Sequence, residues 1–158
     1  MCIRDSYGFD DAPDLDLILI PGGIGTIAEL KNDALLNFLR QRCPHSQVTM
    51  SVCTGSALLA KAGLLDGLAA TSNKMFFELA RSQGDKVDWQ ESARWVDAGQ
   101  YVTSSGVSAG TDMALAVIER VFDAELAEQV MNYTEYQWHR QADADPFAQL
   151  LNQGVTPS

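Results

Sequence analysis

The sequence predicts a single α/β domain, a three-layer sandwich in which helices cover both faces of a mostly parallel β-sheet. Short, continuous apolar segments alternate along the chain with longer segments whose apolar residues recur at helical spacing. That alternation is typical of parallel sheets with crossover helices. The 158 residues are 46% hydrophobic and 20% charged, which supplies enough apolar material for one core in a chain too short for a second domain.

The first half of the chain contains two predicted strands with a helix between them. Residues 15–20 form a continuous aliphatic run that ends at a Pro-Gly-Gly turn, as a buried parallel strand does. Asn32 is a suitable N-cap for a helix over residues 33–42. The apolar run over residues 47–52 is the second strand.

The second half continues the alternation. The helix after the second strand breaks at an Asp-Gly pair and leads to a short strand over residues 68–71. The remaining predicted elements are a helix over 74–83, paired strands over 94–97 and 100–104, and helices over 111–121 and 124–137. Residues 142–158 are weakly patterned, and the acidic run 143–145 is expected to be solvated.

The junction between the second strand and the helix after it has the pattern of a nucleophile elbow. Such a turn forces its central residue into a strained backbone conformation and projects the side chain from the end of the sheet. The central residue here is Cys53, and the small residues Ser51 and Gly55 leave room for the turn. Because the start of a helix favours the thiolate, Cys53 is the candidate nucleophile. The alternative is a cysteine that serves only as a small buried hydrophobe.

Backbone N–H groups beside this cysteine are expected to stabilise negative charge on a substrate that it attacks. The N–H of Thr54 would be one donor, and that of Gly23, after the first strand, the other. Since the carboxyl ends of parallel strands meet at one edge of the sheet, further pocket residues are expected at Gly22, Ile24, Asn73, Ser105, Gly106, Val107 and Asp112. A turn is the alternative role for the glycines, and for Asp112 a structural place in the first turn of a helix is favoured.

Composition argues against several classes of function. A formal net charge of −10 and a sequence pI near 4.4 argue against binding to nucleic acid or to anionic membrane lipids. The sequence contains no apolar run of about 18 residues and no signal-peptide pattern, so the cytoplasm is the expected location. The three cysteines have no CxxC spacing, and the glycine segments lack phosphate-loop patterns, so neither a metal nor a cofactor is expected.

Four segments of the sequence resemble the ThiJ/PfpI superfamily, which is related to class I glutamine amidotransferase domains. They are Ile20-Pro21-Gly22-Gly23, Ser51-Val52-Cys53-Thr54-Gly55, residues 62–71 and residues 103–112. The resemblance implies a flavodoxin-like, class I glutamine amidotransferase-like fold over residues 7–147, followed by a tail over 148–158. The elbow and the Gly-Val-Ser-Ala-Gly segment look most like the isonitrile hydratase-like branch and the sensor domains of related transcriptional regulators. A small-molecule substrate or ligand and a homodimer are therefore expected.

The sequence departs from this superfamily in two places. Many members have a histidine in an Ala-Thr-x-His pattern, where this chain has Asn73, whose amide can orient a substrate but cannot accept a proton. His45 is expected near the opposite edge of the sheet from the elbow, and His139 would reach the site only by folding back or from a dimer partner. The superfamily's first strand–helix–strand unit, whose loop supplies an acid to the cysteine, is absent, which suggests a truncated or misassembled gene product.

Three functions follow from these residues and the resemblance. The first is a cysteine-dependent lyase or hydratase, in which Cys53 attacks the electrophilic carbon of a small molecule and water completes an N-formamide product. The second is a domain that senses a ligand or oxidant without turnover. The third, a cysteine amidase or peptidase, is disfavoured because no histidine is near to protonate a leaving amine.

A serine-hydrolase pattern, G-x-S-x-G, also occurs at residues 106–110. That mechanism needs an acid and then a histidine further along the chain, and the sequence offers no such pair. Close packing of a helix on the sheet and an N-cap by Ser108 explain the same residues better.

Overall fold

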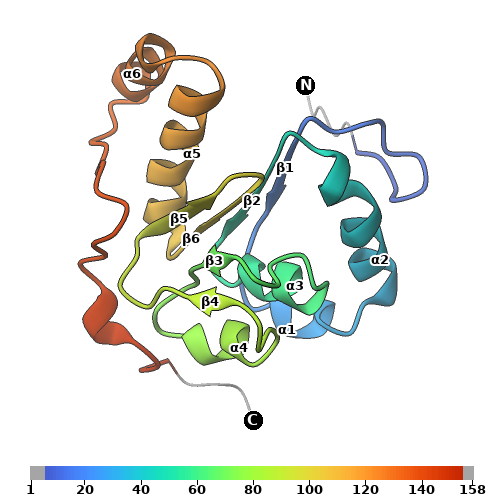
Figure 1. The fold of residues 1–158 in the computed structure, drawn as a ribbon. Coiled ribbons are helices and arrows are strands. Elements are labelled where there is room, and N and C mark those ends of the chain that lie inside the picture. Colours follow the sequence, from blue (N-terminus) through green and yellow to red (C-terminus); the bar gives the residue numbers. More distant parts are fainter. Residues whose placement is uncertain (1–5, 155–158) are drawn as a thin grey trace.

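A four-stranded β-sheet lies at the centre of the molecule, and helices pack on both of its faces (Figure 1). The computed structural model describes residues 6–154. The strands of the sheet are β1 (Leu17–Ile20), β2 (Val48–Val52), β5 (Trp95–Ala98) and β6 (Tyr101–Ser104). They lie in the order β1-β2-β6-β5, with β1, β2 and β6 parallel and β5 antiparallel to β6. The predicted α/β sandwich with a mostly parallel sheet is confirmed.

The helices divide between the two faces of this sheet. The helices near one face are α1 (Thr26–Glu29), α2 (Asp33–Arg42) and α3 (Gly55–Lys61), and α2 runs into a 3-10 turn, η1 (Cys43–His45). The other face is covered by α5 (Val107–Val121), which α6 (Ala124–Tyr133) follows. Each face buries its own apolar core. One core contains Ile18, Ile20, Leu36, Leu39, Leu58 and Leu59, and the other contains Val48, Trp95, Val102, Met113 and Val117.

A second, two-stranded sheet lies beside the first and is formed by β3 (Ala69–Ala70) and β4 (Asp88–Trp89). The strand predicted over residues 68–71 therefore exists but does not join the main sheet. The helix predicted over residues 74–83 is shorter, α4 (Phe77–Arg81). The reason is local, because the Asn73 side chain accepts hydrogen bonds from the N–H groups of Met75 and Phe76 and so replaces the first helical turn.

The two C-terminal helices also differ from the prediction at their ends. Helix α5 begins at Val107 rather than at residue 111, with Gly106 in the N-cap position and no side-chain cap. The predicted N-cap role of Ser108 is therefore wrong, and its Oγ accepts a hydrogen bond from Arg94 Nη2 at 3.3 Å. Helix α6 ends at Tyr133, where Thr134 Oγ1 donates back to the Val130 carbonyl.

We name residues 142–154 the C-terminal strap, because they run along the rim of the sheet and end in a turn, η2 (Ala148–Leu150) (Figure 1). The Arg94 and Trp95 N–H groups donate to the Ala142 carbonyl at 2.7 and 3.2 Å. Asp145 is only 7% exposed, so the prediction that this acid is solvated is wrong. Its charge is buried because it lies among cations, as described below.

One part of the sheet stays open. Leu17 and Leu19 of β1 are exposed, since α5 packs over β2, β5 and β6. An apolar groove of about 540 Å³ runs between β1 and α5 and is lined by Leu19, Pro21, Gly22, Gly23, Met50, Val52, Cys53, Val107, Gly110, Thr111 and Ala114. Two predicted pocket residues, Gly22 and Val107, therefore line this groove.

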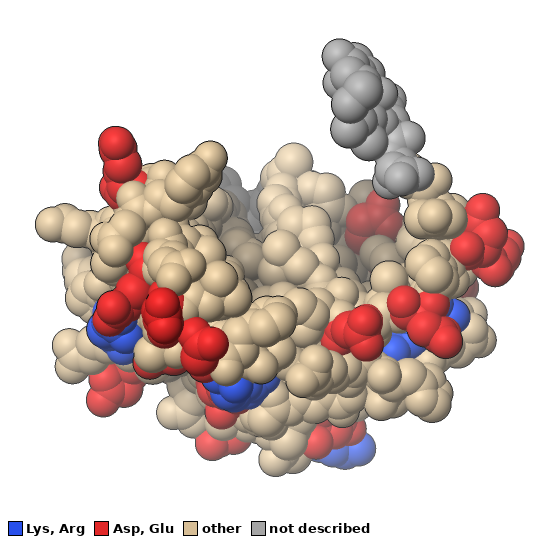
Figure 2. All heavy atoms as spheres, turned by 90° about the horizontal axis from the view of Figure 1, so that it is seen from above, with Lys and Arg blue, Asp and Glu red and all other residues tan. Residues whose placement is uncertain are grey.

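The surface is acidic in character. On the face seen in Figure 2, Lys and Arg side chains lie singly among Asp and Glu side chains, in agreement with the formal net charge of −10. Within residues 6–154, none of the helices is long and apolar enough to cross a membrane.

Candidate functional site around Cys53

The backbone at Cys53 has the strained conformation that the sequence predicts for the central residue of an elbow. Its φ is +59°, a value that costs a residue other than glycine of order 1 kcal/mol or more. The surroundings hold it there. The Cys53 N–H donates to the Ser104 carbonyl at 3.2 Å, and its own carbonyl accepts from Ser72 Oγ at 3.2 Å and from Ser56 Oγ at 3.3 Å. The thiol is left half-buried at the end of β2.

The loop after β1 packs directly against this elbow, and glycines make the contact possible. A Cβ atom at Gly22 would lie 2.5 Å from the Thr54 nitrogen, and one at Gly55 would lie 2.4 Å from the Ile20 carbonyl oxygen. Both positions are closed to any side chain without movement of the backbone. Gly23 has a φ of +125°, a backbone conformation that glycine adopts readily because it has no Cβ atom.

The structure corrects the predicted pair of charge-stabilising donors. The Gly23 N–H donates to Thr54 Oγ1 at 3.0 Å, so it is occupied within the protein and does not face a substrate. Thr54 Oγ1 also shares a hydrogen bond of 2.9 Å with Thr26 Oγ1. The N–H groups of Thr54 and Ile24 donate to no protein acceptor among residues 6–154, and both residues line the same pocket as Cys53.

Thr54→Val is expected to lower the free energy of unfolding by about 1–2 kcal/mol, because the buried Thr26 hydroxyl and the part-buried Gly23 N–H lose their partner. The substitution keeps the shape of the side chain and removes only the hydroxyl, which is buried in the wild type. Urea denaturation measures the effect. Thr134→Val is the control, since that threonine is exposed at the end of α6. An equal loss in both variants would contradict a specific role for the Thr54 hydroxyl.

A pocket of about 280 Å³ opens above Cys53. Its walls combine the elbow, α1, α4 and the loop before α4, and the residues that line it are Gly23, Ile24, Ile27, Cys53, Thr54, Asn73, Phe76 and Leu79. Five of the predicted site residues meet here: Gly23, Ile24, Cys53, Thr54 and Asn73. Ile27, Phe76 and Leu79 were not predicted from the sequence, although Phe76 and Leu79 are apolar residues three apart in a segment predicted to be helical.

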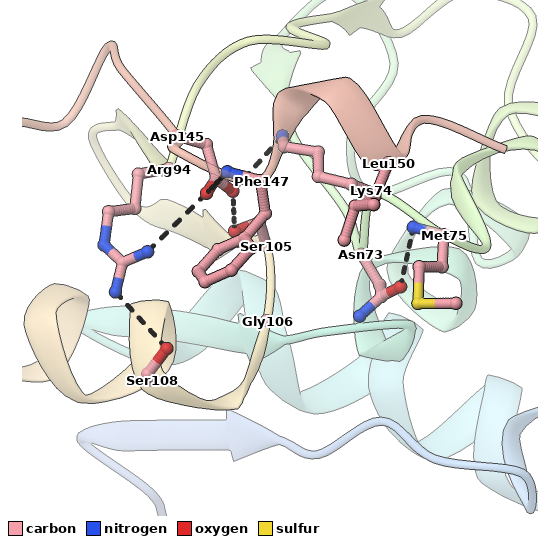
Figure 3. Close-up of a pocket in the computed structure, with 10 residues that line it drawn as sticks. All are labelled: Asn73, Lys74, Met75, Arg94, Ser105, Gly106, Ser108, Asp145, Phe147 and Leu150. Carbon is pink, nitrogen blue, oxygen red and sulfur yellow. Dashed lines mark hydrogen bonds and ion pairs between the residues drawn. The ribbon is translucent and has the colours of Figure 1, made fainter. Parts of the chain in front are cut away.

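A second, smaller pocket of about 230 Å³ adjoins the first and shares Asn73 with it (Figure 3). It is lined by Asn73, Lys74, Met75, Arg94, Ser105, Gly106, Ser108, Asp145, Phe147 and Leu150. The predicted residues Ser105 and Gly106 therefore lie in this second pocket and not in the Cys53 pocket. Figure 3 shows the Asn73 side chain with its carbonyl oxygen turned toward the Met75 N–H.

Asp112 does not line either pocket, and the prediction of a pocket role for it is wrong. It is fully buried, its Oδ2 accepts a hydrogen bond from Arg94 Nε at 2.7 Å, and the same oxygen forms an ion pair with Arg94 Nη2 at 2.6 Å. Its Oδ1 accepts from the Tyr136 hydroxyl at 3.1 Å and from the His139 N–H at 2.8 Å. Burial and the neighbouring Asp112 charge raise the pKa of Tyr136. The carboxylate therefore joins α5 to the chain after α6, a structural role.

Asp145 connects the C-terminal strap to the same cluster. It lies 3.6 Å from Arg94 Nη1 and 3.9 Å from Lys74 Nζ, and it accepts a hydrogen bond from Ser105 Oγ. Lys74 is also buried and donates to Thr71 Oγ1 at 2.8 Å and to the Ala93 carbonyl at 2.6 Å. Burial lowers the pKa of Lys74 to about 8, against the opposing effect of the Asp145 and Glu91 charges.

This lysine is expected to make stability depend on pH. Between pH 8 and 10.5, the unfolded chain, with Lys74 at its ordinary pKa of 10.5, holds more of the proton than the folded protein does. The contribution of Lys74 therefore raises the free energy of unfolding as pH rises from 8 to 10.5. This increase is lost as pH falls to 8 and below. Relative to Lys74→Met, the free energy of unfolding of the wild type should increase by about 2–3 kcal/mol between pH 8 and 10.5. Denaturation of both proteins across the window measures the difference.

Lys86→Met is the matched control, because Lys86 is exposed and pairs only with Asp66 at the surface. Its difference from the wild type should stay nearly constant with pH. A constant difference for Lys74→Met as well would show that the Lys74 amine does not titrate abnormally.

Neither histidine lies at the Cys53 pocket. His45 is in η1, before β2, and His139 contributes its backbone N–H to Asp112. Among residues 6–154, no group of three His, Cys, Asp or Glu side chains could hold a metal ion. The polar groups among the residues that line the pocket are the Cys53 thiol, the Thr54 hydroxyl, the Asn73 amide and backbone groups.

Comparison with known proteins agrees with this geometry. Residues 5–120 match the DJ-1/PfpI family. The chain is 34% identical over 145 residues to isonitrile hydratase from Pseudomonas putida, an alignment that covers 92% of this chain and 60% of that protein. It is 29% identical over 135 residues to the HTH-type transcriptional regulator GbdR from Pseudomonas aeruginosa, covering 85% of this chain and 36% of the regulator.

Solved structures of ThiJ/PfpI and DJ-1 proteins have the same fold as this chain. A ThiJ/PfpI family protein from Pseudomonas syringae superposes with a TM-score of 0.70 at 32% identity, over 87% of this chain and 54% of that one. Drosophila melanogaster DJ-1beta has the same fold, with a TM-score of 0.69 at 21% identity, over 82% of this chain and 68% of that one. The chain thus spans 60% of isonitrile hydratase and a smaller share of the regulator. The chain belongs to the DJ-1/PfpI family.

Proposed function

We propose that this protein is a cysteine-dependent hydratase that converts small isonitriles to N-substituted formamides. The observation that carries the proposal is the strained Cys53 at the mouth of a pocket, with the Thr54 and Ile24 N–H groups free beside it. The likeness to isonitrile hydratase supports it. A small, neutral electrophile suits a site without an imidazole, because no amine leaving group has to be protonated.

In this reaction the Cys53 thiolate forms an S–C bond with the terminal carbon of the isonitrile, and that carbon takes a proton from water. The product of the step is a thioimidate on the sulfur. The hydroxide left by that water then adds to the same carbon, and the proton on its oxygen moves to the nitrogen. The S–C bond breaks as the C=O bond forms, so the formamide leaves and the thiolate is restored. The Thr54 and Ile24 N–H groups stabilise the oxygen that water adds.

The pocket walls suit the substituent on the substrate nitrogen. Ile27, Phe76 and Leu79 present apolar surface, so an alkyl or cycloalkyl group gains free energy when it leaves water. The Asn73 carbonyl oxygen is used by the Met75 and Phe76 N–H groups, which leaves its Nδ2 as a donor to the substrate nitrogen.

A sensor domain is the second candidate function. It is favoured by the 29% identity to a helix-turn-helix regulator over most of this chain. In that case the same pocket binds its ligand, and Cys53 either oxidises or makes no covalent bond. A cysteine amidase is a third candidate. We also propose that the protein is a cytoplasmic homodimer that acts on a small molecule.

The experiment is incubation of the purified protein with an alkyl isonitrile, with the formamide measured by chromatography. Formation above the rate in buffer, saturating with substrate concentration, is the expected result. Saturable binding without formamide would overturn the hydratase in favour of a sensor. Release of amines from simple amides, with isonitriles untouched, would instead identify an amidase.

A further inference from the structure

We propose that the C-terminal strap positions the wall of the Cys53 pocket, with Asp145 and Asn152 as positioning residues that act through the segment from Asn73 to Glu78. The proposal depends on the proposed function only in that the Cys53 pocket is where a ligand binds. The C-terminal strap does not line the Cys53 pocket, and its role is to set how well that pocket fits a ligand.

The far end of the strap holds this segment through its backbone. The Asn152 N–H donates to the Lys74 carbonyl at 2.8 Å, and the Gly154 N–H donates to the Met75 carbonyl at 2.9 Å. The Asn152 side chain accepts from the Glu78 N–H at 2.9 Å. Three backbone groups of the segment from Asn73 to Glu78 are therefore held by residues more than 70 positions away in sequence.

Asn152 is suited to this contact. Its φ is +58°, in the left-handed region that asparagine enters more readily than most residues other than glycine. This turn brings both its N–H and its side-chain oxygen to the same short segment. Gly154 approaches so closely that a Cβ atom there would lie 2.8 Å from Cε1 of Phe76. The strap thus packs on the Phe76 ring, and Phe76 also lines the pocket.

The near end of the strap holds the other side of the same segment. Asp145 lies beside Lys74, the residue directly after Asn73, and is fixed in turn by Arg94 and Ser105. Figure 3 shows the strap passing over these side chains, with Asn73 and Met75 beyond them. Because Asp145, Lys74 and Arg94 are all buried, this anchor is weakly screened by solvent and resists displacement.

The pocket wall needs such support because its own secondary structure is short. Helix α4 has five residues, far fewer than an isolated helix needs to be stable. The Glu78 N–H, near the start of α4, has no partner within the helix and is capped by Asn152 instead. Loss of that cap should loosen Phe76 and the amide of Asn73 together, since Asn73 holds the Phe76 N–H.

The test compares two maleimides that share one reactive group and differ only in their apolar substituent. Cys53 is alkylated with N-ethylmaleimide and with N-cyclohexylmaleimide in a Cys2→Ser background; Cys43 is buried and does not compete. The ratio of the two rates reports how well the pocket accepts a bulky apolar group. Asn152→Ala is expected to change this ratio by about 5- to 10-fold, the equivalent of one lost hydrogen bond. The N-ethylmaleimide rate itself should stay within about 2-fold, because the thiol is untouched.

Two further measurements separate positioning from general stability. Hydrogen exchange at the Glu78 amide should be at least about 10-fold faster in Asn152→Ala, and the melting temperature should change little. Asp145→Asn should shift the rate ratio in the same direction. The controls are Asp143→Asn and Gln149→Ala, which alter exposed residues of the strap and should leave the ratio unchanged.

Each outcome is decisive. An unchanged maleimide ratio in folded Asn152→Ala overturns the positioning role, and so does an equal change in both rates. If isonitriles are turned over, Asn152→Ala should raise KM and leave kcat nearly constant. If the wild type makes no formamide while the maleimide ratio still shifts, the hydratase proposal fails and the role of the strap stands.

Discussion

A Cys53→Ser protein is expected to convert isonitriles to formamides at least about 1,000-fold more slowly than the wild type. A serine hydroxyl is not ionised at neutral pH, and no histidine lines the pocket to take its proton. Enzymes that use serine depend on such a base. Initial rates of formamide production measure the effect, and retention of more than about a tenth of the wild-type rate would contradict a nucleophilic role.

The strained backbone gives this prediction a second readout. Serine keeps the positive φ of Cys53 and should leave stability nearly unchanged. Glycine adopts that φ without strain, so Cys53→Gly is expected to be inactive and yet about 1 kcal/mol more stable than the wild type. Cys2→Ser is the activity control. If the active site stores strain, a substitution that abolishes activity should at the same time raise the free energy of unfolding.

Asp112→Asn is expected to lower the free energy of unfolding by about 3–5 kcal/mol, the usual cost of removing one partner from a buried ion pair. The three hydrogen bonds to Asp112 within residues 6–154 are all donated to it, by Arg94 Nε, the Tyr136 hydroxyl and the His139 N–H, and Arg94 Nη2 adds an ion pair. An asparagine amide would turn an NH₂ group against one of these donors and leave the Arg94 charge uncompensated.

Urea denaturation of the two proteins measures this loss. Asp85→Asn removes the same charge from an exposed position and is expected to change stability by less than about 0.5 kcal/mol. A loss below about 1 kcal/mol in Asp112→Asn would mean that the pair with Arg94 contributes no more than a surface salt bridge.

Local patterns predicted the elements that local chemistry determines. Asn32 caps α2 as expected, with its side chain accepting from the Leu35 N–H at 3.2 Å. The aliphatic runs became β1 and β2 because each has an apolar core to bury against. The elbow at Cys53 was predictable because its small neighbours lie within two residues of it. The meeting of Gly23 and Cys53 followed from the rule for parallel strands, whereas Asn73 follows β3, which lies in the second sheet.

The remaining features depend on contacts between distant residues. No local pattern tells that Asp145 pairs with Lys74 and Arg94, since acidic residues near a terminus are usually solvated. The Gly23 N–H was assigned to a substrate because the sequence does not show where the Thr54 hydroxyl points. Helix α4 was predicted too long because Asn73 was considered for its chemistry and not for its competition with the helix.

The close contact between Gly154 and the Phe76 ring has a practical consequence for work with this protein. A Cβ atom at this position would also lie 2.7 Å from the Met75 carbonyl oxygen, so Gly154→Ala would press on the pocket wall without altering Cys53. A difference in ligand preference between Gly154→Ala and the wild type would then report on the pocket wall itself.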